Sequence, residues 1–499
     1  MNPRYLVALD QGTTSSRAVI FNLEGQIIAS ASYEFPQLYP NPGWVEHNPV
    51  DILTTQIEAL RAAVRKAEIR PAEIAAIGIT NQRETTLIWD RETGKCVYNA
   101  IVWQCRRTTT MVEEIVANGY ADTIRQKTGL VPDAYFSGSK IKWILDHLAL
   151  HEEAKKGNLC FGTIDSFLCW NMVKGHPHVT DATNAGRTML FNLHTQEWDD
   201  ELLNIFDIPK EILPKVVDSA EVIGMLSEDI LGVEIPIAAI AGDQHAALFG
   251  QACFEKGMAK STYGTGCFLL MNIGEKFKLS KNNLLTTIAW RIGGKTTYAL
   301  EGSVFIGGAS VQWLRDEMQF IEHAADSEQI ALQTKDNNGV YLVPAFTGLG
   351  APHWNMHARG MIVGLTRGSN YSHVVRATLE SIAYQASDLL EVMTNDCGEK
   401  QETLRVDGGA SANKFLMQFQ ADIMQIPVEL PAILETTALG VALMAGLSIG
   451  VFKDINDTAN GWHIQDTFVP QMPVEEKNRL LKGWKRAVRA AIAWGEDEQ

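Results

Sequence analysis

The stretch Leu9-Asp10-Gln11-Gly12-Thr13-Thr14-Ser15-Ser16-Arg17 decides the fold class of this chain. It separates two short apolar runs, residues 5–9 and 18–21, which predicts a tight turn between two strands. Glycine lets the backbone approach a ligand closely, and free N–H groups with short hydroxyl side chains are typical of phosphate sites. Asp10 can hold Mg²⁺, directly or through water, and Arg17 can contact a phosphate. We therefore predict a phosphate-binding hairpin; the alternative is an ordinary polar β-turn.

A second strand-turn-strand pattern lies near the middle of the chain. Residues 259–263 and 268–272 are the predicted strands, and Gly264-Thr265-Gly266 is the turn between them. Strands and helical patterns alternate along both halves, which favours an α/β class. The two hairpins predict two α/β lobes, residues 1–250 and 251–499. Neither half contains the GxxxxGK[ST] pattern of a P-loop or a GxGxxG pattern after a strand.

The overall composition excludes several function classes. The chain has 499 residues and a net charge of -16, which argues against broad nucleic-acid binding. Its seven cysteines show no CxxC spacing, so a disulfide framework or a thiolate zinc site is not expected. The start lacks a signal-peptide core, and the uncharged stretch at residues 436–452 lacks flanking aromatic or basic clusters. We expect a buried helix there, no integral membrane span, and a cytoplasmic enzyme.

A carboxylate at the end of another apolar run is a candidate catalytic base. Residues 235–241 are apolar and lead into Gly242-Asp243-Gln244. Burying a carboxylate near a strand end is costly unless the group is paired or functional. In this position it would suit a general base that accepts a hydroxyl proton during phosphoryl transfer. The alternative is a helix N-cap for residues 244–250.

Two further motifs could bind small molecules. In Val406-Asp407-Gly408-Gly409-Ala410-Ser411-Ala412-Asn413, two glycines after a strand would let a flat ring lie against the backbone. The alternative is a glycine-rich turn with a capping Asn. Adjacent Arg83 and Glu84 can donate to and accept from neighbouring hydroxyls of a polyol, and Trp103 could cover its C–H groups. The alternative is a surface ion pair and a core Trp without a function.

Together these motifs resemble those of the actin, sugar-kinase and heat-shock ATPase superfamily, and within it the FGGY carbohydrate kinases. The similarity spans essentially the whole chain and is carried most clearly by residues 7–18, 43–47, 77–85, 135–138 and 344–352. It is strongest to the branch of the family that phosphorylates glycerol. The resemblance implies two actin-like, ribonuclease H-like lobes with the active site in the cleft between them. It also implies ATP and Mg²⁺ as cofactors, glycerol and ATP/ADP as partners, and a homodimer or homotetramer.

The resemblance further implies a role for each site residue. Asp243 would be the catalytic base, and Asp10 would be the carboxylate associated with Mg²⁺. The glycerol site would comprise Arg83, Glu84, Trp103, Tyr135, Asp243, Gln244 and Phe268. The nucleotide would contact Thr13, Thr14, Ser15, Arg17, Thr265, Gly308, Gln312, Gly409 and Asn413. The lobes would close on the substrates and exclude water.

Two other functions remain open from the sequence. A sister kinase acting on a pentulose or a four- to five-carbon polyol is disfavoured, because Asn81-Gln82-Arg83-Glu84 replaces the Gln-Met-His-Gly segment typical of xylulose kinases. A non-catalytic actin-like or chaperone ATPase would lack the polyol motif.

One position and two segments depart from the family pattern. His245 stands where glutamine is usual, which allows a modest change in pH response. Residues 227–234 lack the basic glycine-rich loop that binds fructose 1,6-bisphosphate in enteric members, and Glu234 would repel that anion. The acidic residue that docks an enteric regulator is shifted or missing near residues 473–476. Regulation through these routes is therefore not expected.

Overall fold

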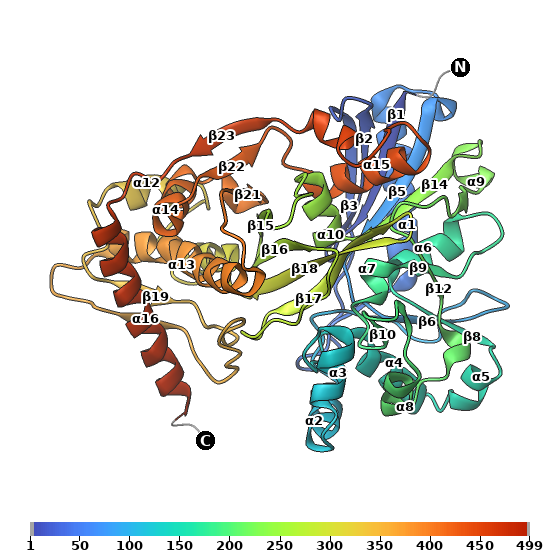
Figure 1. Cartoon of the computed structure of the whole chain (residues 1–499), viewed down its shortest axis with the longest axis horizontal. Coiled ribbons are helices and arrows are strands. Elements are labelled where there is room, and N and C mark those ends of the chain that lie inside the picture. Colours follow the sequence, from blue (N-terminus) through green and yellow to red (C-terminus); the bar gives the residue numbers. More distant parts are fainter. Residues whose placement is uncertain (1–3, 497–499) are drawn as a thin grey trace.

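Two large sheets organise the computed structural model, which describes residues 4–496 (Figure 1). The first sheet has the order β13-β14-β5-β1-β2-β3. Its strands are β1 (Tyr5–Gln11), β2 (Ser15–Asn22), β3 (Ile27–Glu34), β5 (Ile74–Asn81), β13 (Gly224–Met225) and β14 (Pro236–Gly242). The second sheet has the order β17-β18-β16-β15-β21-β22-β23. Its strands are β15 (Ala259–Tyr263), β16 (Cys267–Gly274), β17 (Leu285–Ile292), β18 (Lys295–Val304), β21 (Leu404–Asp407), β22 (Val428–Pro431) and β23 (Ile464–Phe468).

The two sheets share one plan at their centres. β1 pairs antiparallel with β2 and parallel with β5, and β15 pairs antiparallel with β16 and parallel with β21. Each phosphate motif is therefore the turn of the hairpin that begins its sheet. The ends of β5 and β21 lie beside these turns, because parallel strands end at the same edge of a sheet. The predicted α/β class with two similar hairpins is confirmed.

Helices cover both faces of the first sheet. α1 (Pro49–Ala67) packs on β2 and β3, and α15 (Thr436–Ser448) packs on β1, β5 and β14. Every residue of β5 is buried as a result, which explains the continuous apolar sequence of residues 74–79. In the second half, α13 (Tyr371–Cys397) packs on β16 and β18 and against α14 (Lys414–Met424).

Long insertions complete both halves (Figure 1). Between β3 and β14 lie β4 (Glu46–His47), β6 (Leu87–Asp90), β7 (Ala100–Ile101), α2 (Thr109–Ala117), α3 (Ala121–Thr128), α4 (Ser137–His147), α5 (His151–Lys155), β8 (Leu159–Gly162), α6 (Ile164–Met172), β9 (Val179–Asp181), α7 (Ala182–Ala185), β10 (Phe191–Asn192), β11 (Glu197–Trp198), α8 (Asp200–Phe206), β12 (Lys215–Val217) and α9 (Glu228–Leu231). The second half adds α11 (Gly308–Asp316), α12 (Asp326–Leu332), β19 (Tyr341–Val343), β20 (Met361–Val363) and α16 (Val474–Glu496).

Two helices cross where the halves of the chain meet. α10 (Asp243–Gly250) follows β14 and packs closely on α15. A Cβ atom on Gly440 would lie 1.9 Å from the carbonyl oxygen of Ala246, and one on Gly250 would lie 2.0 Å from that of Thr436. Only glycine fits at this crossing. Because α15 comes from the C-terminal half and covers the first sheet, that half also contributes to the core beneath this sheet. The lobe boundary at residues 250/251 stays a prediction.

The uncharged stretch at residues 436–452 forms the buried helix α15, which ends at Ser448. Within residues 4–496, no helix has the length and apolar character that a membrane crossing needs.

Candidate active site

The first hairpin is tighter than its sequence predicted. Asp10 and Gln11 belong to β1, and Ser15 and Ser16 belong to β2, so only residues 12–14 form the turn. The Gly12 N–H donates to the Ser15 carbonyl oxygen at 2.9 Å and closes it. Thr14 at the tip is exposed. Of the hydroxyl side chains in and next to this turn, that of Thr14 is therefore the most open, while Thr13 and Ser15 are half-buried.

Gln82, next to the predicted polyol residues Arg83 and Glu84, and Trp103 both form hydrogen bonds to this turn. Gln82 donates through Nε2 to the Gly12 carbonyl oxygen at 3.0 Å. The Trp103 indole N–H donates to the Thr13 hydroxyl at 2.9 Å. Trp103 is half-buried and meets Tyr135 edge to face, with ring centroids 5.6 Å apart. The predicted polyol and phosphate sites are thus joined by direct hydrogen bonds.

Arg83 and Glu84 are buried, so the surface ion-pair alternative is wrong. Their residue exposures are 3% and 1%. Arg83 Nε lies 3.2 Å from Asp243 Oδ1, and Arg83 Nη2 lies 3.5 Å from the Tyr135 hydroxyl. The structure therefore brings together Arg83, Glu84, Tyr135 and Asp243, as the sequence predicted.

Glu84 has an unusual backbone conformation. Its φ of 61° lies in the left-handed region, which is uncommon for residues other than glycine. Its carbonyl oxygen accepts hydrogen bonds from the hydroxyls of Thr86 at 3.0 Å and Ser137 at 3.1 Å. Strained backbone of this kind persists where surrounding contacts hold it, and it is common at ligand sites.

Asp243 stands at the junction of β14 and α10. Gly242 occupies the N-cap position of α10. The alternative interpretation, in which Asp243 caps this helix, is therefore wrong. Its Oδ1 accepts from the Gln244 N–H at 2.7 Å, and 32% of its side chain is exposed. The carboxylate is therefore anchored yet open to a ligand.

Gln244 is oriented by a lysine that the sequence motifs did not identify. Lys260 Nζ donates to Gln244 Oε1 at 2.6 Å and to the Thr262 hydroxyl at 2.7 Å. Because Lys260 donates to the carboxamide oxygen of Gln244, the NH₂ group of this side chain is the part that can donate to a ligand. Burial lowers the pKa of Lys260, while Asp407 and Asp243 act in the opposite direction.

Two more buried charges were missed by sequence reasoning. Glu301 on β18 accepts from Arg83 at 2.6 and 3.1 Å, and Arg187 donates to Glu84 at 2.6 Å. A signal for Glu301 existed, because a charge inside an apolar strand pattern needs a buried partner. Arg187 stands in a loop after α7 and carries no comparable signal.

Asp10 fits a role in Mg²⁺ binding. Burial raises the pKa of Asp10 to about 6; Arg17 opposes this, and the carboxylates of Asp243 and Glu435 add to it. Within residues 4–496, no group of three or more His, Cys, Asp and Glu side chains is arranged as a metal site. Mg²⁺ commonly uses one or two carboxylates together with substrate phosphates, so this donor set fits that ion. The Arg17 guanidinium pairs with Glu435 through Nη1, so this carboxylate lies beside the group predicted to contact a phosphate.

The second hairpin docks on the start of α11. The Gly308 N–H donates to the Gly264 carbonyl oxygen at 2.9 Å, and the Ala309 N–H donates to that of Thr265 at 3.0 Å. Thr265 and Gln312 are exposed beside this junction. Phe268 is half-buried on β16, and its place in the substrate site stays a prediction.

The motif after β21 has an open surface. Gly408 has a φ of 88°, and a Cβ atom on Gly409 would meet nothing within 4 Å. Asn413 caps α14, because its Oδ1 accepts from the Leu416 N–H at 2.9 Å. The capping expected in the alternative interpretation is therefore present. The open strip at Gly409 still leaves room for a flat ring.

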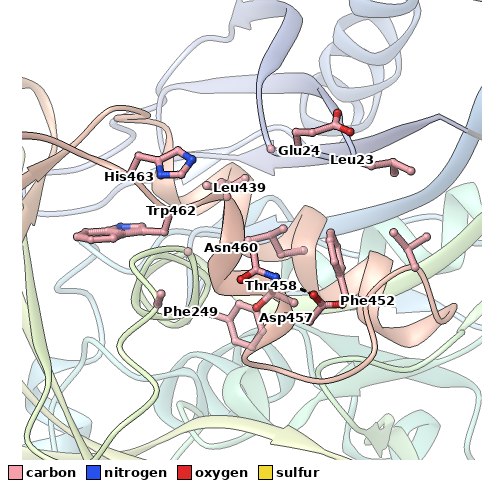
Figure 2. A pocket seen from close by; sticks show the side chains of 16 residues that line it. Leu23, Glu24, Phe249, Leu439, Phe452, Asp457, Thr458, Asn460, Trp462 and His463 are labelled. Carbon is pink, nitrogen blue, oxygen red and sulfur yellow. Dashed lines mark hydrogen bonds between the residues drawn. The ribbon is translucent and has the colours of Figure 1, made fainter.

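None of these residues lines the cavity in Figure 2. That cavity measures about 440 Å³ and lies between the end of α10 and one side of α15, where Leu23, Phe249, Leu439 and Trp462 are among the residues that line it. The candidate site instead lies between the two sheets.

Comparisons with known proteins agree with this arrangement. A model of the N-terminal domain of the FGGY family of carbohydrate kinases matches residues 5–250, and a model of its C-terminal domain matches residues 259–449. The chain belongs to the FGGY family of carbohydrate kinases. The predicted family and fold are thus confirmed.

Relatives of this FGGY kinase include a glycerol kinase from Caldanaerobacter subterraneus subsp. tengcongensis, 58% identical over 99% of this chain and 100% of the relative. Glycerol kinase 2 from Thermotoga maritima is also 58% identical, over 98% of this chain and 99% of the relative. The crystal structure of Plasmodium falciparum glycerol kinase with ADP has a TM-score of 0.92 and 35% identity, covering 98% of this chain and 99% of that one.

Proposed function

We propose that this FGGY kinase transfers the γ-phosphoryl group of ATP to a terminal hydroxyl of glycerol, giving ADP and sn-glycerol 3-phosphate. The observation that carries the proposal is the 3.2 Å approach of Asp243 to Arg83, which unites the candidate base with the buried polyol motif. The full-length similarity to proteins named glycerol kinase supports the same substrate and the use of ATP with Mg²⁺.

Polar atoms around the site match the needs of a triol. Arg83 and the Gln244 NH₂ group donate, Glu84 and Asp243 accept, and Tyr135 can do both. Trp103 offers an apolar wall for the carbon chain, as proposed also for Phe268. A pocket of this kind leaves buried polar groups unpaired when one hydroxyl is absent, which can cost on the order of 10⁴-fold in discrimination.

Asp243 acts as the base in this scheme. Its carboxylate accepts the proton of the terminal hydroxyl as the oxygen attacks the γ-phosphorus in line. The N–H groups and hydroxyls of the two hairpins, including Thr13 and Thr265, stabilise charge on the phosphoryl oxygens. Mg²⁺, held by Asp10 and the nucleotide, would neutralise part of that charge.

The remaining nucleotide contacts are proposed along the second half of the cleft. Thr14, Ser15 and Arg17 would bind phosphates from the first hairpin. Gly308, Gln312, Gly409 and Asn413 would bind the rest of the nucleotide. A homodimer or homotetramer and a cytoplasmic location remain part of the proposal, and the seven free cysteines are compatible with a reducing compartment.

A coupled assay of ADP release tests the function. The enzyme would be supplied with ATP, Mg²⁺ and, in turn, glycerol, propane-1,2-diol, propane-1,3-diol, erythritol, ribitol and D-xylulose. Of these six compounds, we expect only glycerol to give rapid ADP release. ADP release at the same rate without any polyol would indicate the ATPase alternative, and faster turnover of D-xylulose or ribitol would indicate a sister kinase.

A further inference from the structure

Two buried side chains outside all the predicted motifs complete a chain of charges behind the proposed glycerol site. Glu301 lies on β18, in the second sheet, and Arg187 follows α7 in the first half of the protein. Neither side chain is exposed to solvent. The order of contacts is Asp243, Arg83, Glu301, Arg187 and Glu84.

Glu301 fixes the plane of the Arg83 guanidinium. Arg83 Nη1 donates to Glu301 Oε2 at 2.6 Å, and Nη2 donates to Oε1 at 3.1 Å. Two parallel bonds of this kind hold both atoms of the fork in one orientation. In that orientation Arg83 Nε faces Asp243 and Nη2 faces the Tyr135 hydroxyl. The direction in which Arg83 presents its donors is therefore set from behind.

Arg187 performs the matching task for Glu84. Its Nε donates to Glu84 Oε1 at 2.6 Å, while Nη1 and Nη2 donate to Glu301 at 3.3 and 3.1 Å. Arg187 thus holds one oxygen of Glu84, Oε1, in a fixed place, 3.9 Å from Arg83 Nε. Burial raises the pKa of Glu84, and the neighbouring Arg187 and Arg83 act against that rise. Arg187 thereby favours the ionised form of Glu84, which can accept a hydrogen bond from a polyol hydroxyl.

We infer that Glu301 and Arg187 are positioning residues that orient Arg83 and Glu84 for polyol recognition, an inference that rests on the proposed function. β18 also pairs with β16, the second strand of the hairpin whose turn carries Thr265; Cys267 lies opposite Val304. Glu301 therefore ties the polyol pocket to the lobe that carries this hairpin. The distance between the attacking hydroxyl and the phosphate depends on that connection.

The test compares Glu301→Gln and Arg187→Gln with the wild-type enzyme in steady-state kinetics. Both variants are expected to raise KM for glycerol at least tenfold, with KM for ATP changed less than threefold. In Arg187→Lys the charge is kept, but a lysine ammonium lacks the planar fork that lets Arg187 bridge Glu84 and Glu301. This variant is therefore expected to show the same rise in KM for glycerol. Glu380→Gln is the matched control, because Glu380 is also buried and pairs with Arg376 at 2.8 Å within α13. It should lower the unfolding temperature but leave both KM values unchanged.

If a single variant does not fold, the double variant Glu301→Gln/Arg187→Met replaces it, because it keeps the net charge of the pocket constant. An unchanged KM for glycerol in any folded variant overturns the inference. The inference is also overturned if Glu301→Gln and Glu380→Gln lower kcat and raise the KM values for glycerol and ATP to the same extent. That pattern indicates only structural damage. Absence of glycerol-dependent ADP release from the wild-type enzyme would instead refute the proposed function.

Discussion

Asp243→Asn separates the chemical role of this side chain from its structural role. Asparagine has nearly the same shape, and its amide oxygen can still accept from the Gln244 N–H, which lies 2.7 Å from Oδ1 in the wild type. The ion pair with Arg83 at 3.2 Å becomes a neutral contact. Arg83 remains held by two hydrogen bonds to Glu301. The site should therefore keep its geometry while losing its base.

The magnitudes favour a large effect on turnover and a small effect on binding. A positioned base typically contributes ~10²–10⁴-fold, or roughly 3–5 kcal/mol of barrier. A hydrogen bond to a charged group contributes about 1.5–3 kcal/mol, and asparagine retains part of it because it can still bond to a hydroxyl. We expect kcat to fall by at least about a hundredfold. Glycerol affinity should fall by less than about tenfold, corresponding to 1.4 kcal/mol.

Coupled kinetics for kcat and titration calorimetry for glycerol binding measure the two effects separately. Asp388→Asn is a suitable control, because Asp388 accepts a hydrogen bond from the Trp484 indole at 2.7 Å outside the site. It should leave kcat unchanged. A kcat of Asp243→Asn within threefold of wild type would refute the assignment of the base. Complete loss of glycerol binding with a preserved fold would show that the residue acts mainly in binding.

Three further outcomes follow from named contacts. Burial lowers the pKa of His47 from 6.5 to about 4, so the folded state binds its proton only at lower pH than the unfolded state does. The free energy of unfolding should therefore fall by about 3 kcal/mol from this residue as the pH drops from 6.5 to 4, and urea titrations of His47→Gln should lack that part of the slope. Trp103→Phe removes the 2.9 Å bond to Thr13 and should raise KM for ATP and glycerol several-fold each; a normal KM for ATP would contradict a link between the two sites. Gly440→Ala has no room at the helix crossing and should cost about 1–3 kcal/mol in thermal or chemical unfolding, whereas an unchanged midpoint would mean that the helices separate freely.

Local patterns were enough to predict the hairpins and the long helix. The strands around Gly12 and Gly264 were found because apolar runs on either side of glycine-rich polar turns specify a hairpin locally. The apolar residues of 373–393 also recur at helical spacing, which predicts a helix there, and the structure has α13 at Tyr371–Cys397. The sheet on which α15 packs was not predictable. This helix is apolar on all sides, so its sequence does not show which face packs on which sheet. The need for glycine at residue 440 is explained only by the structure, in which the backbone of α10 lies against it.

The site was predicted in parts, and its internal connections were not. Arg83, Glu84 and Asp243 were identified, since polar residues at the ends of apolar strands point to chemistry. Glu301 lies 218 residues from Arg83 in sequence. A single sequence contains no signal for a pairing over that distance. It shows that a buried charge needs a partner, but not which partner the fold supplies.

The need for this charged framework follows from the nature of the proposed substrate. Glycerol has no charge, and every one of its hydroxyls resembles a water molecule, which is far more abundant. A site that merely admitted hydroxyls would let water attack ATP. Donors and acceptors held rigidly by Glu301, Arg187 and Lys260 cannot turn to suit separate waters, but they match three hydroxyls fixed on one carbon chain. Under the proposed function, binding energy that only the triol supplies would bring one oxygen to Asp243, and a cleft that closed on the substrates would keep phosphoryl transfer to water slow.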